Sequence, residues 1–188
     1  EIRQRYGGGH ELRATLRRPS MQEVYDHVRS DPSSLRGFIG SCCRSLGVEP
    51  SEELLEATAT AAAAATATGL AEVMRRLKAA ALELEELEEA PETVELSEDS
   101  EEVKAELASR SQRIMEELKP MFPKIEVVEE VSLLRVFQLQ DKKRSSDSSV
   151  ADVFRQVESR KERLKIADYS ITQASLEHVF NQLARQDH

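Results

Sequence analysis

Residues 125–139 read IEVVEEVSLLRVFQL and contain two apolar runs, Ile125 to Val131 and Leu133 to Leu139, with one residue between them. Two strand-like runs so close together predict a β-hairpin. The stretch His10 to Arg17 alternates apolar and polar residues, as a half-buried strand does. We expect a fourth strand over Leu164 to Ile171.

Helices are predicted around these strands. The segment from Ser20 to Arg29 begins with a capping-box pattern, because Glu23 follows Ser20 by three residues. A second helix is expected from Val150 to about Arg160, and its apolar side is predicted to carry Val150, Val153, Phe154 and Val157. A final helix is expected from Ser175 to about Arg185. The resulting order, β-α-β-β-α-β plus a C-terminal helix, predicts an α+β fold of the ferredoxin-like split βαβ type.

A long segment interrupts this pattern. We therefore expect a discontinuous α+β domain, residues 1–30 and 120–188, and a helical, Ala-rich and acidic insertion over residues 31–119. Ala57 to Thr68 holds only Ala and Thr and is interpreted as a helical or frayed spacer. Apolar spacing predicts one helix over Leu70 to Leu84 and another over Ser100 to Leu118, and together they suggest an antiparallel helical hairpin.

Composition limits the functions available to the 188 residues. The chain is 39% hydrophobic but only 4% aromatic, and its net charge is −9. Glu83 to Glu106 alone contributes a net −11, so the remainder carries +2. An acidic chain repels nucleic-acid phosphates, and Phe137 and Tyr169 are the only aromatic side chains available on the predicted strands for base stacking. We therefore expect no nucleic-acid partner, and the lack of a long apolar run predicts no membrane insertion by this chain.

No catalytic, metal or cofactor site is predicted. The glycines of Gly37-Phe38-Ile39-Gly40-Ser41 lack the Lys of a phosphate-binding loop and are interpreted as a turn or helix cap. The histidines have no metal-ligand spacing, and the adjacent Cys42 and Cys43 form neither a disulfide framework nor a zinc site, as is typical of a reducing cytosolic compartment. The carboxylates of the acidic block lie on a predicted helix surface, where they remain solvated rather than acting as general acids.

Residues 164–180 read LKIADYSITQASLEHVF, in which a strand ending in acid-Tyr-Ser-hydrophobe-Thr-Gln leads into a Ser-Leu-Glu-x-Val-Phe helix. This segment resembles the one that closes the nucleotide-binding half of subfamily A ABC transporters, the ABCA-type lipid transporters. Residues 5–12, RYGGGHEL, resemble the Arg-Phe/Tyr-Gly-x-Gly-Tyr-x-Leu segment after the ATPase core of that family, although His10 replaces the usual aromatic residue. Phe122-Pro123 and the helix that begins at Val150 resemble the middle of the same regulatory domain.

The resemblance implies a cytosolic regulatory domain, on the cytosolic face of a membrane, in an integral membrane transporter. Its implied partners are its own ABC cassette and the second regulatory domain, with which it would pair to modulate cassette association. Mg-ATP would bind the parent cassette, since this chain has no Walker A, signature or catalytic carboxylate motif. A lipid substrate would be reached only through the parent protein.

The same motif supplies the candidate interface residues. The ring of Tyr169 is expected to pack near the end of the last strand while its hydroxyl finds a polar partner. Ser175 is a plausible N-cap, and Glu177 would lie in the positive first turn of the helix that it begins. The apolar stripe of this helix carries Leu176, Val179 and Phe180, and its outer face carries Gln182 and Arg185.

Two other functions remain open from sequence. The first is a helical scaffold or adaptor in which the 70–118 hairpin contacts other proteins. The second is an ACT-like small-molecule sensor, which shares the fold but requires a pocket of converging polar groups that the sequence does not locate.

Overall fold

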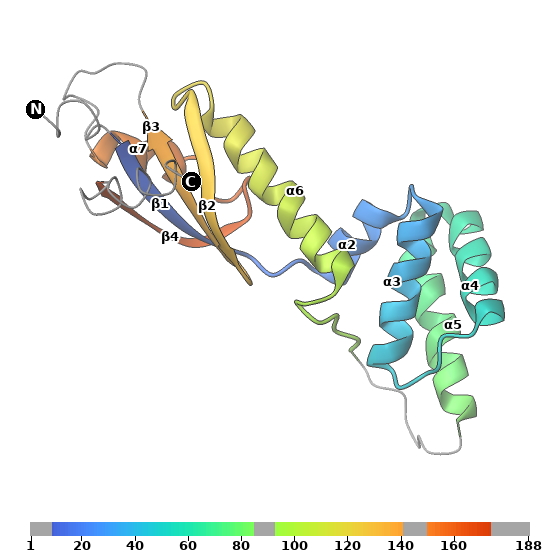
Figure 1. The fold of residues 1–188 in the computed structure, drawn as a ribbon. Coiled ribbons are helices and arrows are strands. Elements are labelled where there is room, and N and C mark those ends of the chain that lie inside the picture. Colours follow the sequence, from blue (N-terminus) through green and yellow to red (C-terminus); the bar gives the residue numbers. More distant parts are fainter. Residues whose placement is uncertain (1–8, 85–92, 141–149, 174–188) are drawn as a thin grey trace, which may run out of the picture. The chain divides into compact units, whose positions relative to one another are not determined.

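The computed structural model of the chain describes residues 9–84, 93–140 and 150–173 (Figure 1). The chain divides into two compact units. The sheet unit comprises Glu1–Arg18 and Leu107–His188, and the helical unit comprises Pro19–Glu106.

A four-stranded antiparallel sheet forms the centre of the sheet unit. Its strands are β1 (Gly9–Leu16), β2 (Lys124–Val131), β3 (Leu134–Gln140) and β4 (Ile166–Gln173), in the spatial order β2-β3-β1-β4. The two edge strands are therefore β2 and β4 (Figure 1). The expected α+β class and the expected hairpin, now β2 and β3, are confirmed.

One face of the sheet is buried because side chains alternate along β1. Leu12, Ala14 and Leu16 are fully buried, whereas Arg13 and Thr15 between them are exposed. Leu12 lies opposite Phe137 of β3, which is also fully buried. The buried face therefore runs across the two central strands, and burial of each large apolar side chain contributes about 1.5–3 kcal/mol.

Helix α6 (Glu101–Leu118) contributes its later turns to this core. The apolar side chains that it buries in the sheet unit are Leu107, Ile114 and Leu118. Two arginines add hydrogen bonds to this core. Nε of Arg135 donates to Oγ of Ser111 at 3.0 Å, and Nη1 of Arg110 donates to the carbonyl oxygen of Arg17 at 2.6 Å. Helix α7 (Val150–Glu158) packs against β4 and buries Val153 and Val157.

The helical unit contains α2 (Met21–Val28), α3 (Pro32–Ser45), α4 (Glu52–Ala64), the short 3-10 helix η1 (Thr66–Thr68) and α5 (Gly69–Glu83). Side-chain oxygens of Ser20, Asp31 and Ser51 cap the first three helices by accepting a backbone N–H from three residues later. Both hydrogen bonds of the predicted capping box between Ser20 and Glu23 are present.

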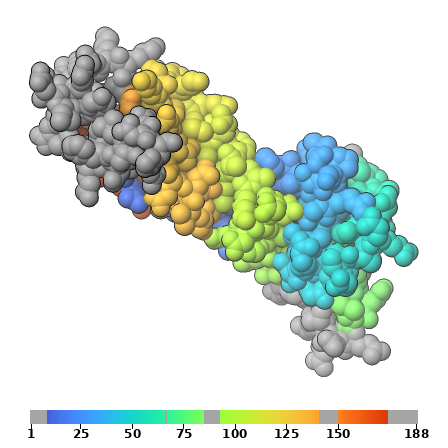
Figure 2. All heavy atoms as spheres, in the orientation of Figure 1, coloured from blue at the N-terminus to red at the C-terminus, as the bar shows by residue number. Residues whose placement is uncertain are grey.

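Close packing of α2, α3, α4 and α5 builds the second core. The rings of Tyr25 and Phe38 lie 5.9 Å apart, and Val73 and Leu77 of α5 are fully buried. Gly69 lies against Tyr25, where a Cβ atom would come within 1.8 Å of the tyrosine hydroxyl oxygen. Figure 2 shows the side chains of α3 and α4 meeting on the surface of this unit.

The unit boundaries differ from the expected ones at residues 30 and 119. Helix α2 belongs to the helical unit because Tyr25 packs on Phe38 of α3, and residues 107–118 belong to the sheet unit because their apolar face enters its core. The division falls within α6, between Glu106 and Leu107.

The expected hairpin of residues 70–118 is wrong. Among the described residues, α5 packs mainly against α4, with a smaller contact to α3, rather than pairing with α6. The reason is that residues 57–64, expected to be a spacer, form the second half of α4, and their small side chains let α5 approach closely. The expected turn or helix cap at Gly37 and Gly40 is also wrong, because both residues lie inside α3.

Candidate interaction surface

The candidate surface lies on α7, β4 and the turn of residues 159–165 that joins them. Of the interface residues expected from sequence, Tyr169 lies within the described residues. The others lie outside them: Ser175, Leu176, Glu177, Val179, Phe180, Gln182 and Arg185.

Tyr169 is half-buried beside α7, as expected from sequence. Its ring centroid lies 5.4 Å from that of Phe154, and its hydroxyl donates to Oε2 of Glu158 at 2.5 Å. Burial raises the pKa of the Tyr169 hydroxyl above its ordinary value, and the hydrogen bond to Glu158 raises it further. The phenol therefore stays protonated at neutral pH and acts as a donor that fixes the ring against α7.

Phe154 is the large apolar side chain exposed next to Tyr169. It is 50% exposed, and Val150 one turn earlier is 38% exposed. The four apolar residues share one side of α7, as their spacing predicts, but only Val153 and Val157 of the four are buried. The helix presents Val153 and Val157 to the core, while Val150 and Phe154, also four residues apart, form a neighbouring ridge. Phe154 and Tyr169 thus form an exposed aromatic pair at the edge strand β4.

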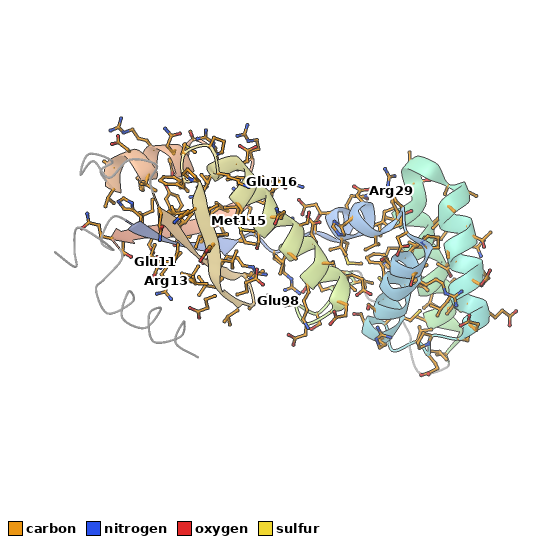
Figure 3. All side chains as sticks on the ribbon, turned by 45° about the horizontal axis from the view of Figure 1, so that its top comes forward. Glu11, Arg13, Arg29, Glu98, Met115 and Glu116 are labelled. Atoms are coloured by element: carbon orange, nitrogen blue, oxygen red, sulfur yellow. The ribbon has the colours of Figure 1, made fainter. Side chains whose placement is uncertain are left out.

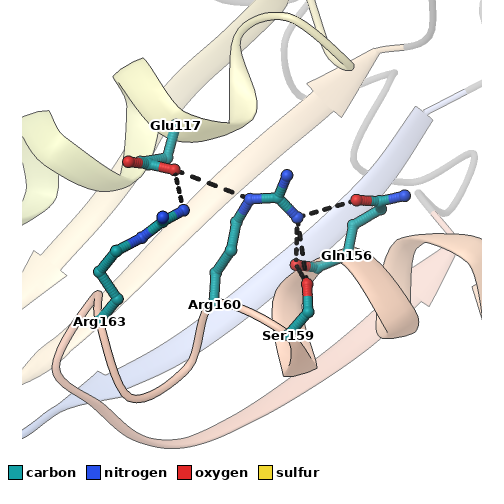
Figure 4. Close-up of polar contacts among 5 residues, drawn as sticks. All are labelled: Glu117, Gln156, Ser159, Arg160 and Arg163. Carbon is teal, nitrogen blue, oxygen red and sulfur yellow. Dashed lines mark hydrogen bonds and ion pairs between the residues drawn. The ribbon is translucent and has the colours of Figure 1, made fainter.

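The turn after α7 is held by a network centred on Arg160 (Figure 4). Nη1 of Arg160 donates to the carbonyl oxygen of Gln156 at 2.9 Å and to its Oε1 at 2.8 Å, and also reaches Oγ of Ser159 at 3.2 Å. Glu117 of α6 forms ion pairs with Nε of Arg160 at 3.7 Å and with Nη2 of Arg163 at 2.5 Å. This network links α6 to the segment that leads into β4 and so positions the aromatic pair of Phe154 and Tyr169.

On the sheet face opposite the core, β1 and β4 carry polar side chains, whereas β3 contributes the buried Val136. Glu11 and Arg13 project from this face of β1, with an ion pair of 3.6 Å between them (Figure 3). The register places Ser170 opposite Arg13 and Thr172 opposite Glu11, so these β4 residues share that polar face.

Residues 94–173 match the family model of the ABCA1-like C-terminal R1 regulatory domain. The family expected from residues 164–180 is thereby confirmed for this segment. Over residues 94–173 the chain is therefore similar to the ABCA1-like R1 regulatory domain. The matched segment includes α6, β2, β3, α7 and β4, together with Tyr169, Phe154 and the Arg160 network. Comparisons with curated proteins and with solved structures gave no match.

The R1 match corrects the expected extent of the resemblance. It begins at residue 94, inside the segment assigned from sequence to the insertion, and it does not include residues 1–30. Helix α6 is part of the R1 segment because its apolar face completes the sheet core. Strand β1, which lies between β3 and β4, precedes the match and completes the sheet.

The other residues considered from sequence are placed outside this surface. Cys42 and Cys43 are buried in α3, and burial raises the pKa of the Cys42 thiol to about 12. His27 lies 3.0 Å from a carboxylate oxygen of Glu106, and His10 is buried in β1. Within the described ranges, no group of His, Cys, Asp and Glu is arranged to hold a metal ion, and no helix combines the length and hydrophobicity needed to cross a bilayer.

Proposed function

We propose that the sheet unit is the non-catalytic regulatory domain of an ABCA-type, ATP-driven membrane transporter of lipids, lying on the cytosolic face of the membrane. The observation that carries this proposal is the R1 match over residues 94–173. In this role the domain pairs with its counterpart behind the other cassette and modulates cassette association. Mg-ATP binds the parent cassettes, and the lipid contacts other parts of the parent protein.

The proposed architecture is the ferredoxin-like split βαβ arrangement, with the helical unit inserted between β1 and α6. Two features support it. The strand order β2-β3-β1-β4 is antiparallel throughout, and α6 and α7 stand in the chain where the two helices of that pattern are required.

Pairing can modulate the cassettes only if its free energy differs between their associated and separated states. The exposed half of Phe154 is a suitable source of such a difference. A Phe side chain buries about 200 Å² in full, so covering the exposed half is worth about 2 kcal/mol. If this contact forms in only one cassette state, the equilibrium changes about thirtyfold.

The test measures ATPase activity of the full-length transporter that carries this domain, for Phe154→Ser and for the control Arg155→Ala. Arg155 is exposed on α7, whereas Phe154 also packs on Tyr169, so the melting temperature of each isolated variant is measured to check that it folds. We expect Phe154→Ser to change ATPase activity severalfold and Arg155→Ala to leave it unchanged. Wild-type ATPase activity in Phe154→Ser would contradict this role for the surface.

A further inference from the structure

The two edges of the sheet are built differently. Strand β2 carries Lys124, Glu126, Glu129 and Glu130, and its pairing with β3 is irregular between Val127 and Glu129. Charged side chains and bulges are the features by which proteins prevent an edge strand from pairing with another chain. The β2 edge is therefore protected.

The β4 edge has less of this protection: its pairing with β1 is irregular only near Ile166, opposite Thr15 and Leu16, and the carboxylate of Asp168 accepts the backbone N–H of Tyr169 at 2.9 Å. Its eight residues read IADYSITQ, with Asp168 as the single charged residue, no Pro and no Gly. Within the described ranges β4 is paired with β1 alone, and Ala167, Asp168, Ser170, Thr172 and Gln173 are exposed. From Asp168 to Gln173 the strand is regular and exposed at its outer residues, and such a strand is a template for a further antiparallel strand.

We propose that the outer edge of β4 pairs antiparallel with β4 of a second copy of this domain, about a two-fold axis at Ser170. This inference names the contact surface of the proposed function and, for its physiological meaning, rests on it. The two four-stranded sheets join into one continuous sheet, with the helices of both copies on the same face. The Phe154 and Tyr169 rings then flank the new strand pair and lose exposed apolar area.

The register follows from side-chain complementarity. A two-fold axis perpendicular to the sheet keeps each face on its own side, so directly opposed residues come from the same face. Centred on Ser170, the pairing sets Tyr169 against the Ile171 of the second copy, an aromatic and β-branched pair that is favourable across strands. It also sets Asp168 against Thr172, so no like charges face each other.

Neighbouring registers are less favourable. A two-fold axis at Asp168 places the two carboxylates directly opposite each other, which is destabilising. An axis at Tyr169 brings the two Asp168 side chains into diagonal neighbour positions and forces both tyrosine rings together at the axis, although each already packs on its own Phe154.

The net charge of −9 does not oppose this contact, because the acidic residues are concentrated in the other unit. The sheet unit holds 19 basic and 15 acidic residues, a net of +4, whereas the helical unit holds 7 basic and 20 acidic residues, a net of −13. Two sheet units therefore repel each other only weakly at physiological ionic strength.

The experiment follows self-association of the full 188-residue chain by sedimentation equilibrium, in the wild type and in Ser170→Glu and Ser170→Lys. At the two-fold axis either variant faces its own like charge, so both should raise the dimer dissociation constant, by up to about fivefold. Within one chain the two changes act oppositely, because Ser170 lies opposite Arg13 of β1. An equimolar mixture of the two variants should restore wild-type or tighter association.

A second measurement uses disulfide trapping. Ser170→Cys should form a covalent dimer on mild oxidation, whereas the control Glu126→Cys, on the same face but at the β2 edge, should not. The natural Cys42 and Cys43 are buried and contribute little background. Melting temperatures of the monomeric variants check that each one folds.

Three results would overturn the inference. They are a wild-type chain that stays monomeric at millimolar concentration, opposite effects of the Glu and Lys variants, and trapping at residue 126 instead of 170. A monomeric chain whose Phe154→Ser variant still alters ATPase activity would reject the β4 contact and leave the regulatory function standing. A Ser170-centred dimer with no ATPase effect of Phe154→Ser would support the β4 contact and reject the regulatory function.

Discussion

Gly69→Ala should destabilise the helical unit, although alanine is the better helix former. An added Cβ at Gly69 would lie 1.8 Å from Oη of Tyr25, 2.8 Å from its Cζ and 3.1 Å from the carbonyl oxygen of Ala62. Tyr25 is 3% exposed and packs on Phe38, so its ring has little room to withdraw. Either the ring or the start of α5 must move.

The magnitude is the difference between two effects. Overpacking a core costs about 1–3 kcal/mol, and the helix preference for Ala over Gly returns about 0.5–1 kcal/mol. A net loss of about 1–2 kcal/mol remains. For a unit of this size each kcal/mol lowers the melting temperature by about 4–8 °C.

Gly40→Ala is the matched control. Its Cβ would lie 3.6 Å from Nη1 of Arg44 and 4.0 Å from Cδ2 of Leu55, which are ordinary contacts inside α3. This change should stabilise the unit by about 0.5–1 kcal/mol. Adding Tyr25→Phe to Gly69→Ala removes the closest atom but leaves Cζ of the ring 2.8 Å away, so it should recover part of the lost stability.

Urea unfolding is followed by circular dichroism and by the reaction of Cys42 and Cys43 with a thiol reagent. Both thiols belong to the helical unit and are buried, so their reaction reports the unfolding of that unit specifically. The reasoning fails if Gly69→Ala is as stable as the wild type, or if Tyr25→Phe gives no recovery.

Three further predictions concern the sheet unit and the whole chain. Tyr169→Phe should lower the free energy of unfolding by about 1 kcal/mol at pH 8, because it removes the hydrogen bond to Glu158. The folded pKa of this phenol lies above its unfolded value, so the stabilisation is complete below pH 10 and is lost as pH rises further. Urea unfolding should therefore show a smaller difference between wild type and variant at pH 10.5 than at pH 8. Arg110→Ala should lower the free energy of unfolding by at least about 2 kcal/mol in the same assay, because this side chain is 1% exposed and donates to a main-chain carbonyl. Arg113→Ala, at an exposed position, should leave it unchanged, and equal effects of the two variants would contradict a structural role for Arg110. Calorimetric titration of the chain with Mg-ATP should give no binding heat, and micromolar binding would refute this prediction.

Several features could be predicted from the sequence because they depend on neighbouring residues. Alternation along His10 to Arg17 and the two runs after Ile125 specify strands of period two, and the structure places them at β1, β2 and β3. The capping box at Ser20 was also predicted, since it needs only residues close in the chain. For Tyr169 the sequence predicted that the ring packs, whereas its neighbours Phe154 and Glu158 come from another element.

Tertiary structure decided the remainder. Gly37 and Gly40 favour a turn locally, yet α3 continues through them because its buried face contributes Phe38 and Ile39 to the core of the helical unit. The apolar spacing of α5 does not specify which helix covers it, and the packing of the small residues of α4 against α5 decided this. Periodicity specifies which side of an element is apolar, whereas the surface that covers that side depends on residues far along the chain. For that reason Phe154 is exposed, although it lies next to the buried Val153 and four residues from Val150.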